Sequence, residues 1–172
     1  MCDQLTAENE SSWYYVEKIL FKLKKILFIL CCFCLFPALY GQKAEKAAVK
    51  AVIRRFFEGM EKKDTALLKS ACMPSVMLQT FRVNKEGVAG VVSEPFSRFL
   101  QAVATPRPEQ FREVVSFKSI STEQSLASVW TPYTFYIDGK VSHTGTNSFQ
   151  LVKTPDGWKI QYIIDTRRKP QP

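Results

Sequence analysis

The chain contains one histidine, His143, and it lies in a stretch whose residue types alternate as those of a β-strand do. Because successive strand residues face opposite sides of a sheet, His143, Asn147 and Phe149 share one face. That face is apolar at Phe149 and polar at the other two positions, as the floor of a ligand pocket requires. An imidazole titrates near neutral pH and can donate or accept a proton during a reaction. His143 is therefore the candidate catalytic residue of such a pocket, as a general acid or base. The alternative is a partly buried histidine bonded to a backbone carbonyl or to Asn147.

Neighbouring elements supply further candidates for binding a ligand. Asn147 can hold a substrate oxygen or orient the imidazole, and the Tyr133 hydroxyl can donate a hydrogen bond to a developing oxyanion. For Tyr133 the alternative is core packing with its hydroxyl at the rim of the core. Trp130 and Asp165 complete the predicted polar set, and Phe56 is expected to line the pocket from the first helix.

Two placements are open for Asp165 and Arg167. Strict alternation from Trp158 onward puts both side chains on the outside of the sheet, where an ion pair contributes little stability. A β-bulge at the adjacent Ile163 and Ile164 turns both inward instead. The carboxylate can then pair with the imidazole, or the guanidinium can bind an acidic ligand through two N–H groups. We expect the outer placement and keep the inner one as the alternative.

The residue types argue against a metal site and a bound cofactor. One histidine and one cysteine on separate elements cannot supply the usual ligand set of a metal. The chain also has no glycine-rich phosphate loop and no nucleophile elbow. We therefore predict no metal and no cofactor. Cys72 is the only cysteine after residue 41, and we expect it to be buried as a small apolar side chain.

Helical and strand patterns follow one another along the chain. Ala44 to Lys63 repeats apolar side chains at the spacing of one helical face, and Asp64 is a good N-cap for a second helix, Thr65 to Cys72. A third helix is expected after a cap at Ser93. The remaining periodic segments alternate as strands do, with turn residues such as Asp-Gly between them: Val76–Val83, Val88–Val92, Glu113–Ser121, Ala127–Ile137, Val141–Lys153 and Trp158–Arg167.

Helices followed by a long antiparallel meander predict an α+β fold. Long, twisted strands curl, so we expect the N-terminal helices to pack on a curved, mostly antiparallel sheet and to leave a conical cavity. Residues 42–172 are enough for one domain with one hydrophobic core.

Residues 1–41 are typical of a leader that contains a secretory signal peptide. Lys22 and two further lysines precede the apolar run Ile26–Leu39, which is shorter than the roughly 20 residues of a membrane span and matches a signal segment. We expect cleavage between Gly41 and Gln42 and a periplasmic or secreted domain, with an uncleaved anchor as the alternative. Contact with a membrane is expected only through this segment. Three explanations stay open for the polar stretch before Lys18: a true extension, a disordered leader or a mis-assigned start.

The net charge of +8 permits binding to nucleic acid or anionic lipid. The basic residues are scattered, however, and no nucleic-acid-binding motif accompanies them. We therefore interpret the charge as a solvated surface and predict no nucleic-acid partner.

The order helix, helix, hairpin, helix and then a meander ending in Gly-Trp-Lys-Ile resembles the nuclear transport factor 2-like superfamily. Ketosteroid isomerase, scytalone dehydratase, the SnoaL-like polyketide cyclases and a lumazine-binding family share that conical fold. The pieces that carry the resemblance are FFEGMEKKDTALLKSACMPSVML and SFQLVKTPDGWKIQYIIDTRR, and it covers Glu45 to Arg168. It implies the fold but no single reaction, because the superfamily includes enzymes, binding modules and interaction domains. The chain differs from the isomerases in lacking an evident pair of pocket carboxylates and from scytalone dehydratase in having one histidine rather than two, so neither mechanism is carried over.

These observations predict an exported domain that binds a small, mostly apolar molecule between its sheet and its helices. One alternative is a cofactor-free lyase, isomerase or hydrolase that uses His143 as a general acid or base. The other is a homodimeric protein-interaction domain, for which Trp130 and Tyr136 on the opposite face of the sheet are candidate contacts.

Overall fold

The computed structural model describes residues 18, 20–25 and 41–170. The chain divides into two units, Met1–Lys43 and Ala44–Pro172, and the sheet and the cavity described below belong to the second. Residues 18 and 20–25 are helical, whereas the predicted signal segment, Ile26–Leu39, lies outside the described residues. Among the described residues, no helix combines the length and the apolar character that crossing a bilayer requires.

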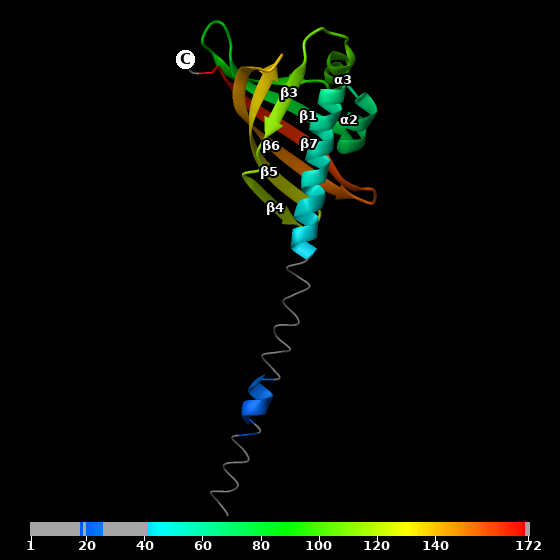
Figure 1. Ribbon diagram of the computed structural model, residues 1–172, viewed down its shortest axis with the longest axis vertical. Coiled ribbons are helices and arrows are strands. Elements are labelled where there is room, and N and C mark those ends of the chain that lie inside the picture. Colours follow the sequence, from blue (N-terminus) through cyan, green and yellow to red (C-terminus); the bar gives the residue numbers. More distant parts are fainter. Residues whose placement is uncertain (1–17, 19, 26–40, 171–172) are drawn as a thin grey trace, which may run out of the picture. The chain divides into compact units, whose positions relative to one another are not determined.

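Residues 41–62 form the N-terminal helix, in agreement with the predicted helical face. Val49, Val52, Ile53 and Phe56 follow the spacing of one helical side, and each is at most 6% exposed because that side packs on the sheet. Figure 1 shows this helix (cyan) lying across the sheet, with α2 and α3 beside it.

The N-terminal helix ends in a tight corner that starts α2 (Thr65–Ala71). Lys63 adopts a left-handed φ of 57°, and the Asp64 N–H donates to the Gly59 carbonyl at 2.9 Å, a helix C-terminal motif of the Schellman type. The Asp64 carboxylate then accepts from the first N–H groups of α2, as predicted for an N-cap. Gly59 is required here, because an added Cβ would lie 2.9 Å from Leu68 Cγ.

The helix α3 (Phe96–Ala104) begins later than the sequence predicts. Ser93 is not its cap, because β2 (Ala89–Glu94) continues past it and the Ser93 hydroxyl accepts a hydrogen bond from Gln79 on the neighbouring strand at 3.0 Å. Pro95 occupies the cap position, which is compatible with its fixed φ.

A single seven-stranded sheet forms the rest of the unit, in the order β2-β1-β7-β6-β5-β3, with β4 also paired to β5. Only the β1–β7 pair is parallel, and Figure 1 shows the sheet curving around the helices. The predicted α+β class and curved, mostly antiparallel sheet are therefore confirmed. Besides β2, the sheet consists of β1 (Cys72–Val83), β3 (Phe111–Val115), β4 (Ser119–Glu123), β5 (Leu126–Ile137), β6 (Lys140–Thr154) and β7 (Gly157–Arg168).

The segment predicted as one strand, Glu113–Ser121, is divided into β3 and β4. Both pair with β5, but the pairing shifts by one residue between Val115↔Tyr133 and Ser119↔Trp130. Pro132 lies opposite the break and has no N–H for the ladder; its carbonyl accepts from Ser116 N–H at 3.0 Å.

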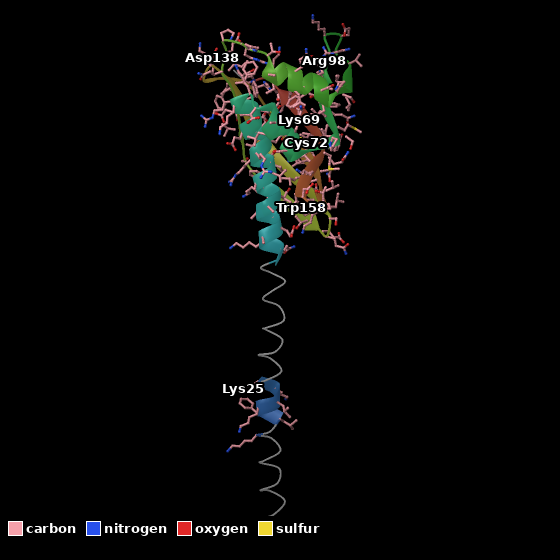
Figure 2. All side chains as sticks on the ribbon, turned by 90° about the vertical axis from the view of Figure 1, so that its right-hand side faces the viewer. Lys25, Lys69, Cys72, Arg98, Asp138 and Trp158 are labelled. Carbon is pink, nitrogen blue, oxygen red and sulfur yellow. The ribbon has the colours of Figure 1, made fainter. Side chains whose placement is uncertain are left out.

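The hydrophobic core lies between the N-terminal helix and the inner face of β5, β6 and β7. Phe149 and Leu151 of β6 are fully buried there, as the strand alternation predicts. At the other end of the unit from Asp138, Trp158 lies beside the N-terminal helix (Figure 2), and its indole N–H donates to Glu45 at 2.7 Å. Cys72 is buried, and burial raises the pKa of its thiol to about 12, so the prediction of an inert apolar role is consistent with its surroundings.

Candidate functional site: a cavity with one polar end

A cavity of about 870 Å³ lies between the inner face of the sheet and the helices. The N-terminal helix and α3 supply one wall through apolar side chains such as Phe56 and Phe99. The sheet supplies the other wall, which changes from Phe149 to polar side chains along β5, β6 and β7. We call this second region the polar end; its members are Glu113, Tyr133, His143, Asn147, Asp165 and Arg167.

Five of the six residues predicted for a pocket line this cavity: His143, Tyr133, Asn147, Asp165 and Phe56. The prediction for Trp130 is wrong. Its side chain is 47% exposed, while its neighbours Val129 and Thr131 are buried, so strand alternation turns the indole to the opposite face. Trp130 pairs there with Ser119 and Ser148.

The expected outer placement of Asp165 is also wrong, and the bulged alternative describes the structure. The β6–β7 register shifts by one residue where Leu151 pairs with Ile160 and Gln150 pairs with Tyr162, which leaves Gln161 as the extra residue. This β-bulge inverts the alternation that follows it. Asp165 is consequently only 9% exposed on the inner face.

The carboxylate of Asp165 is held by three side chains. Thr80 donates to Oδ1 at 2.6 Å, Tyr133 donates to Oδ2 at 3.0 Å and Arg167 Nε donates to Oδ2 at 3.1 Å. Its predicted pairing with the imidazole is replaced by these contacts. Because both oxygens are engaged and one partner is cationic, a buried charge is accommodated here.

Tyr133 reaches Asp165 by lying over a glycine. In the sheet, Tyr133 pairs with Gly145, and a Cβ at Gly145 would lie 2.5 Å from the tyrosine ring. The pKa of the Tyr133 hydroxyl is raised well above its ordinary value by burial and by the charge of Asp165. This hydroxyl is therefore a hydrogen-bond donor that is already committed to Asp165 and to the Thr166 carbonyl.

Glu113 is a second carboxyl group in the polar end, and the sequence analysis missed it. It is partly buried, and its Oε1 accepts a hydrogen bond from Asn147 at 2.9 Å. Burial raises its pKa to about 7, and the charge of Asp165 adds to that increase, while the Asn147 hydrogen bond and Arg167 oppose it. Glu113 lies between Phe111 and Val115 on the inner face of β3. This spacing of two was the sequence signal that could have identified it as a pocket residue.

His143 lies against aromatic rings near the same end. Its ring stacks on Phe135 with centroids 4.9 Å apart and meets Tyr133 edge-on at 5.8 Å. The Ser142 hydroxyl lies 3.1 Å from Nδ1 and can serve either neutral tautomer. Burial lowers the pKa of the imidazole and the charge of Arg167 lowers it further, while Asp165 raises it, so the neutral ring predominates at pH 7.

The apolar wall is built from stacked phenylalanines. Phe56 stacks on Phe99 with centroids 5.8 Å apart and meets Phe149 edge-on at 6.4 Å. These rings join the two helices to the sheet, and all three line the cavity. Among the residues that the structure describes, no three His, Cys, Asp or Glu side chains gather as a metal-ligand set.

The cavity combines an aromatic wall with a polar end, and charged side chains outside that end, such as Glu61, Lys63 and Arg107, also line it. Apolar walls with convergent polar groups are usual in small-molecule sites. Glu113 can change its protonation state near pH 7, and neutral His143 can donate or accept a hydrogen bond. Asp165, by contrast, is satisfied by the protein and serves to position Tyr133 and Arg167.

No protein-family model matches the chain, and no curated protein matches it. Several solved structures, however, are similar to it. A nuclear transport factor 2-like protein of unknown function from Shewanella baltica has a TM-score of 0.58 at 17% identity, over 74% of this chain and 96% of that chain. A protein from Streptomyces avermitilis named as a candidate dehydratase of the nuclear transport factor 2-like family has a TM-score of 0.56 at 16% identity, over 74% and 99%.

A domain of unknown function with a cystatin-like fold from Nostoc punctiforme has a TM-score of 0.55 at 16% identity, over 74% of this chain and 79% of that chain. The chain thus has the nuclear transport factor 2-like, or cystatin-like, fold. The resemblance predicted from the sequence is confirmed for the fold, and likeness at this level of identity carries no reaction with it.

Proposed function

We propose that this protein is a binding domain for a small, mostly apolar molecule that carries one polar group. The observation that supports the proposal is the cavity of about 870 Å³, in which an aromatic wall faces a polar end. Cavities of roughly 300–1,000 Å³ hold small ligands, and their few polar groups fix the orientation of the ligand. The apolar body would lie against Phe56 and Phe99, with its polar group at Glu113 and His143.

Native mass spectrometry of the full chain purified from its own host tests the proposal. We expect a co-purified small molecule that is released on unfolding. Ala102 of α3 lines the cavity and is exposed, so Ala102→Trp is expected to fill the space and lose the molecule. Ala104→Trp, on the same helix but outside the set of lining residues, is the matched control and should retain it. A cavity-filled variant that carries as much ligand as the control would refute binding in this cavity.

A second candidate function is a cofactor-free lyase, isomerase or hydrolase with His143 as general acid or base. Two observations favour it: the imidazole lines the cavity beside a second titratable group, Glu113, and a structural neighbour is named as a candidate dehydratase. The test is conversion of the co-purified molecule by the wild type and by His143→Gln. Normal turnover by the variant would exclude His143 as the catalyst.

We also propose that the domain is exported and forms a homodimer through the outer face of the sheet. Support for the interface comes from apolar side chains exposed on that face, with Val114, Trp130 and Val141 each 44–47% exposed. Light scattering of the full chain should give twice the monomer mass, and Trp130→Ser should reduce it. N-terminal sequencing of host material should find Gln42 first if the leader is removed.

A further inference from the structure

The two carboxyl groups of the polar end differ in how their charges are balanced. Asp165 has a cationic partner, Arg167, and donors on both oxygens. Glu113 has one amide donor, from Asn147. Among the described residues, no cation is bonded to the Glu113 carboxyl group, although it is partly buried beside the charge of Asp165.

We propose that the polar group of the ligand is a protonated amine, which ionised Glu113 binds at the polar end of the cavity. This assignment rests on the binding function proposed above. The amine completes a set in which each carboxylate of the polar end has one cation: Arg167 for Asp165 and the ligand for Glu113. The ligand is accordingly an amphipathic amine with an apolar body.

An acidic ligand is disfavoured by the same groups. The Nε of Arg167 is used by Asp165, and the imidazole of His143 is neutral because burial and Arg167 lower its pKa. Bound next to Glu113, a ligand carboxylate would lie beside two protein carboxyl groups, and like charges at short range repel strongly.

A protonated amine gains more from this site than a neutral hydroxyl does. Its N–H groups make charge-assisted hydrogen bonds to a carboxylate.

The pH dependence of binding follows from the groups that face Glu113. Across the sheet these are Tyr133 on β5, His143 on β6, and Asp165 with Arg167 on β7. The N-terminal helix and the corner after it add Glu61 and Lys63, β2 adds Glu94, and the segment after α3 adds Arg107 and Glu109. Arg112 precedes Glu113 on β3 and also lines the cavity. With the pKa of Glu113 raised to about 7, the carboxylate form increases as pH rises through 7. Affinity for an amine should therefore increase over the same interval.

Three probes of matched size test the proposal on the full chain by calorimetry: 3-phenylpropylamine, 3-phenylpropan-1-ol and 3-phenylpropanoate. The amine keeps its proton throughout, because its pKa is close to the value of about 10 for a lysine side chain. We expect it to bind about tenfold or more tightly than the alcohol at pH 8, as a charge-assisted hydrogen bond to a carboxylate allows. Its affinity should fall when the pH is lowered to about 6, where Glu113 is protonated.

Glu113→Gln keeps the shape of the side chain and should remove both the preference for the amine and its pH dependence. Glu123→Gln, at the exposed end of β4, is the control and should change neither. The pH series on the wild type remains decisive if the Glu113 variant does not fold. Tighter binding of the alcohol or the carboxylate overturns the amine assignment and leaves the cavity a binding site, whereas binding of none of the three overturns the amine assignment and counts against the binding function as well.

Discussion

The Tyr133 hydroxyl donates to Asp165 Oδ2 at 3.0 Å although the two residues belong to strands that are not neighbours. Strand β6 lies between them, and its residue at this level is Gly145, which pairs with Tyr133 on one side and Arg167 on the other. The absence of a side chain at Gly145 lets the tyrosine ring cross β6. The polar end of the cavity is therefore organised around one glycine.

Gly145→Ala is expected to destabilise the fold by about 2–4 kcal/mol, because an added methyl group in a packed site forces its neighbours to move. The new Cβ would lie 2.5 Å from Tyr133 Cε1 and would collide with the Thr166 carbonyl oxygen. Urea unfolding measures the change. Gly90→Ala is the matched control, since nothing lies within 4 Å of a Cβ there. Equal stability of the two variants would show that Tyr133 does not lie over Gly145.

Strand alternation was sufficient to predict the β6 face of the cavity. His143, Asn147, Phe149 and Leu151 all lie on the inner face, as their spacing of two predicts. The first two helices were predicted for a similar reason: Asp64 and the apolar face of the N-terminal helix are local signals, and tertiary packing does not alter them.

Alternation could not predict Asp165, because the bulge at Gln161 shifts the register of β7. The adjacent isoleucines suggested a bulge two residues later, yet nothing in the residue types fixes its position. A single extra residue moves every later side chain to the other face. Register in this strand is set by pairing with β6, which is a tertiary property.

Glu113 was missed for a different reason. The predicted strand began at this residue, whereas β3 begins at Phe111. When Phe111 is included in the strand, Glu113 lies between two apolar residues that face inward. A carboxyl group at such a position indicates either a β-bulge that turns it outward or a residue that lines a pocket. The short edge strand gave too few alternating positions to make that choice from the sequence.

Two threonines of the inner face should respond in opposite ways to loss of the hydroxyl group. Thr131 is fully buried, and its Oγ1 has no hydrogen-bond partner among the described residues. Thr131→Val is therefore expected to stabilise the fold by about 1 kcal/mol, because an unpaired buried hydroxyl is costly. Thr80→Val removes a donor to Asp165 and should destabilise the fold by about 1.5–3 kcal/mol. Thermal unfolding compares both with wild type, and destabilisation by both would mean that the Thr131 hydroxyl is satisfied.

Stability should depend on pH through Glu113. Its pKa is about 7 in the folded chain against an ordinary value of 4.5, so the folded state holds the proton more tightly. The stability that this provides is fully present below about pH 4.5 and is lost as pH rises to about 7, with a total on the order of 3 kcal/mol. Glu113→Gln should lack this loss, and the difference between variant and wild type in urea titrations should grow over that interval. A difference that stays constant with pH would contradict the raised pKa of Glu113. Glu123→Gln is the control, and its stability should differ from that of the wild type by a constant amount.

The imidazole of His143 reports the charges of the polar end directly, since its NMR signals are those of the only histidine in the chain. Burial and the charge of Arg167 lower its pKa, while Asp165 raises it. The wild-type titration should therefore have its midpoint below the ordinary value of about 6.5. Removing the positive charge with Arg167→Gln should move the midpoint up, and removing the negative charge with Asp165→Asn should move it further down.

Arg168→Gln removes a positive charge one residue along β7 and is the control, because Arg168 does not line the cavity. Shifts of the same sign in the two inward variants would mean that the imidazole responds to altered packing and that these two charges do not set its pKa.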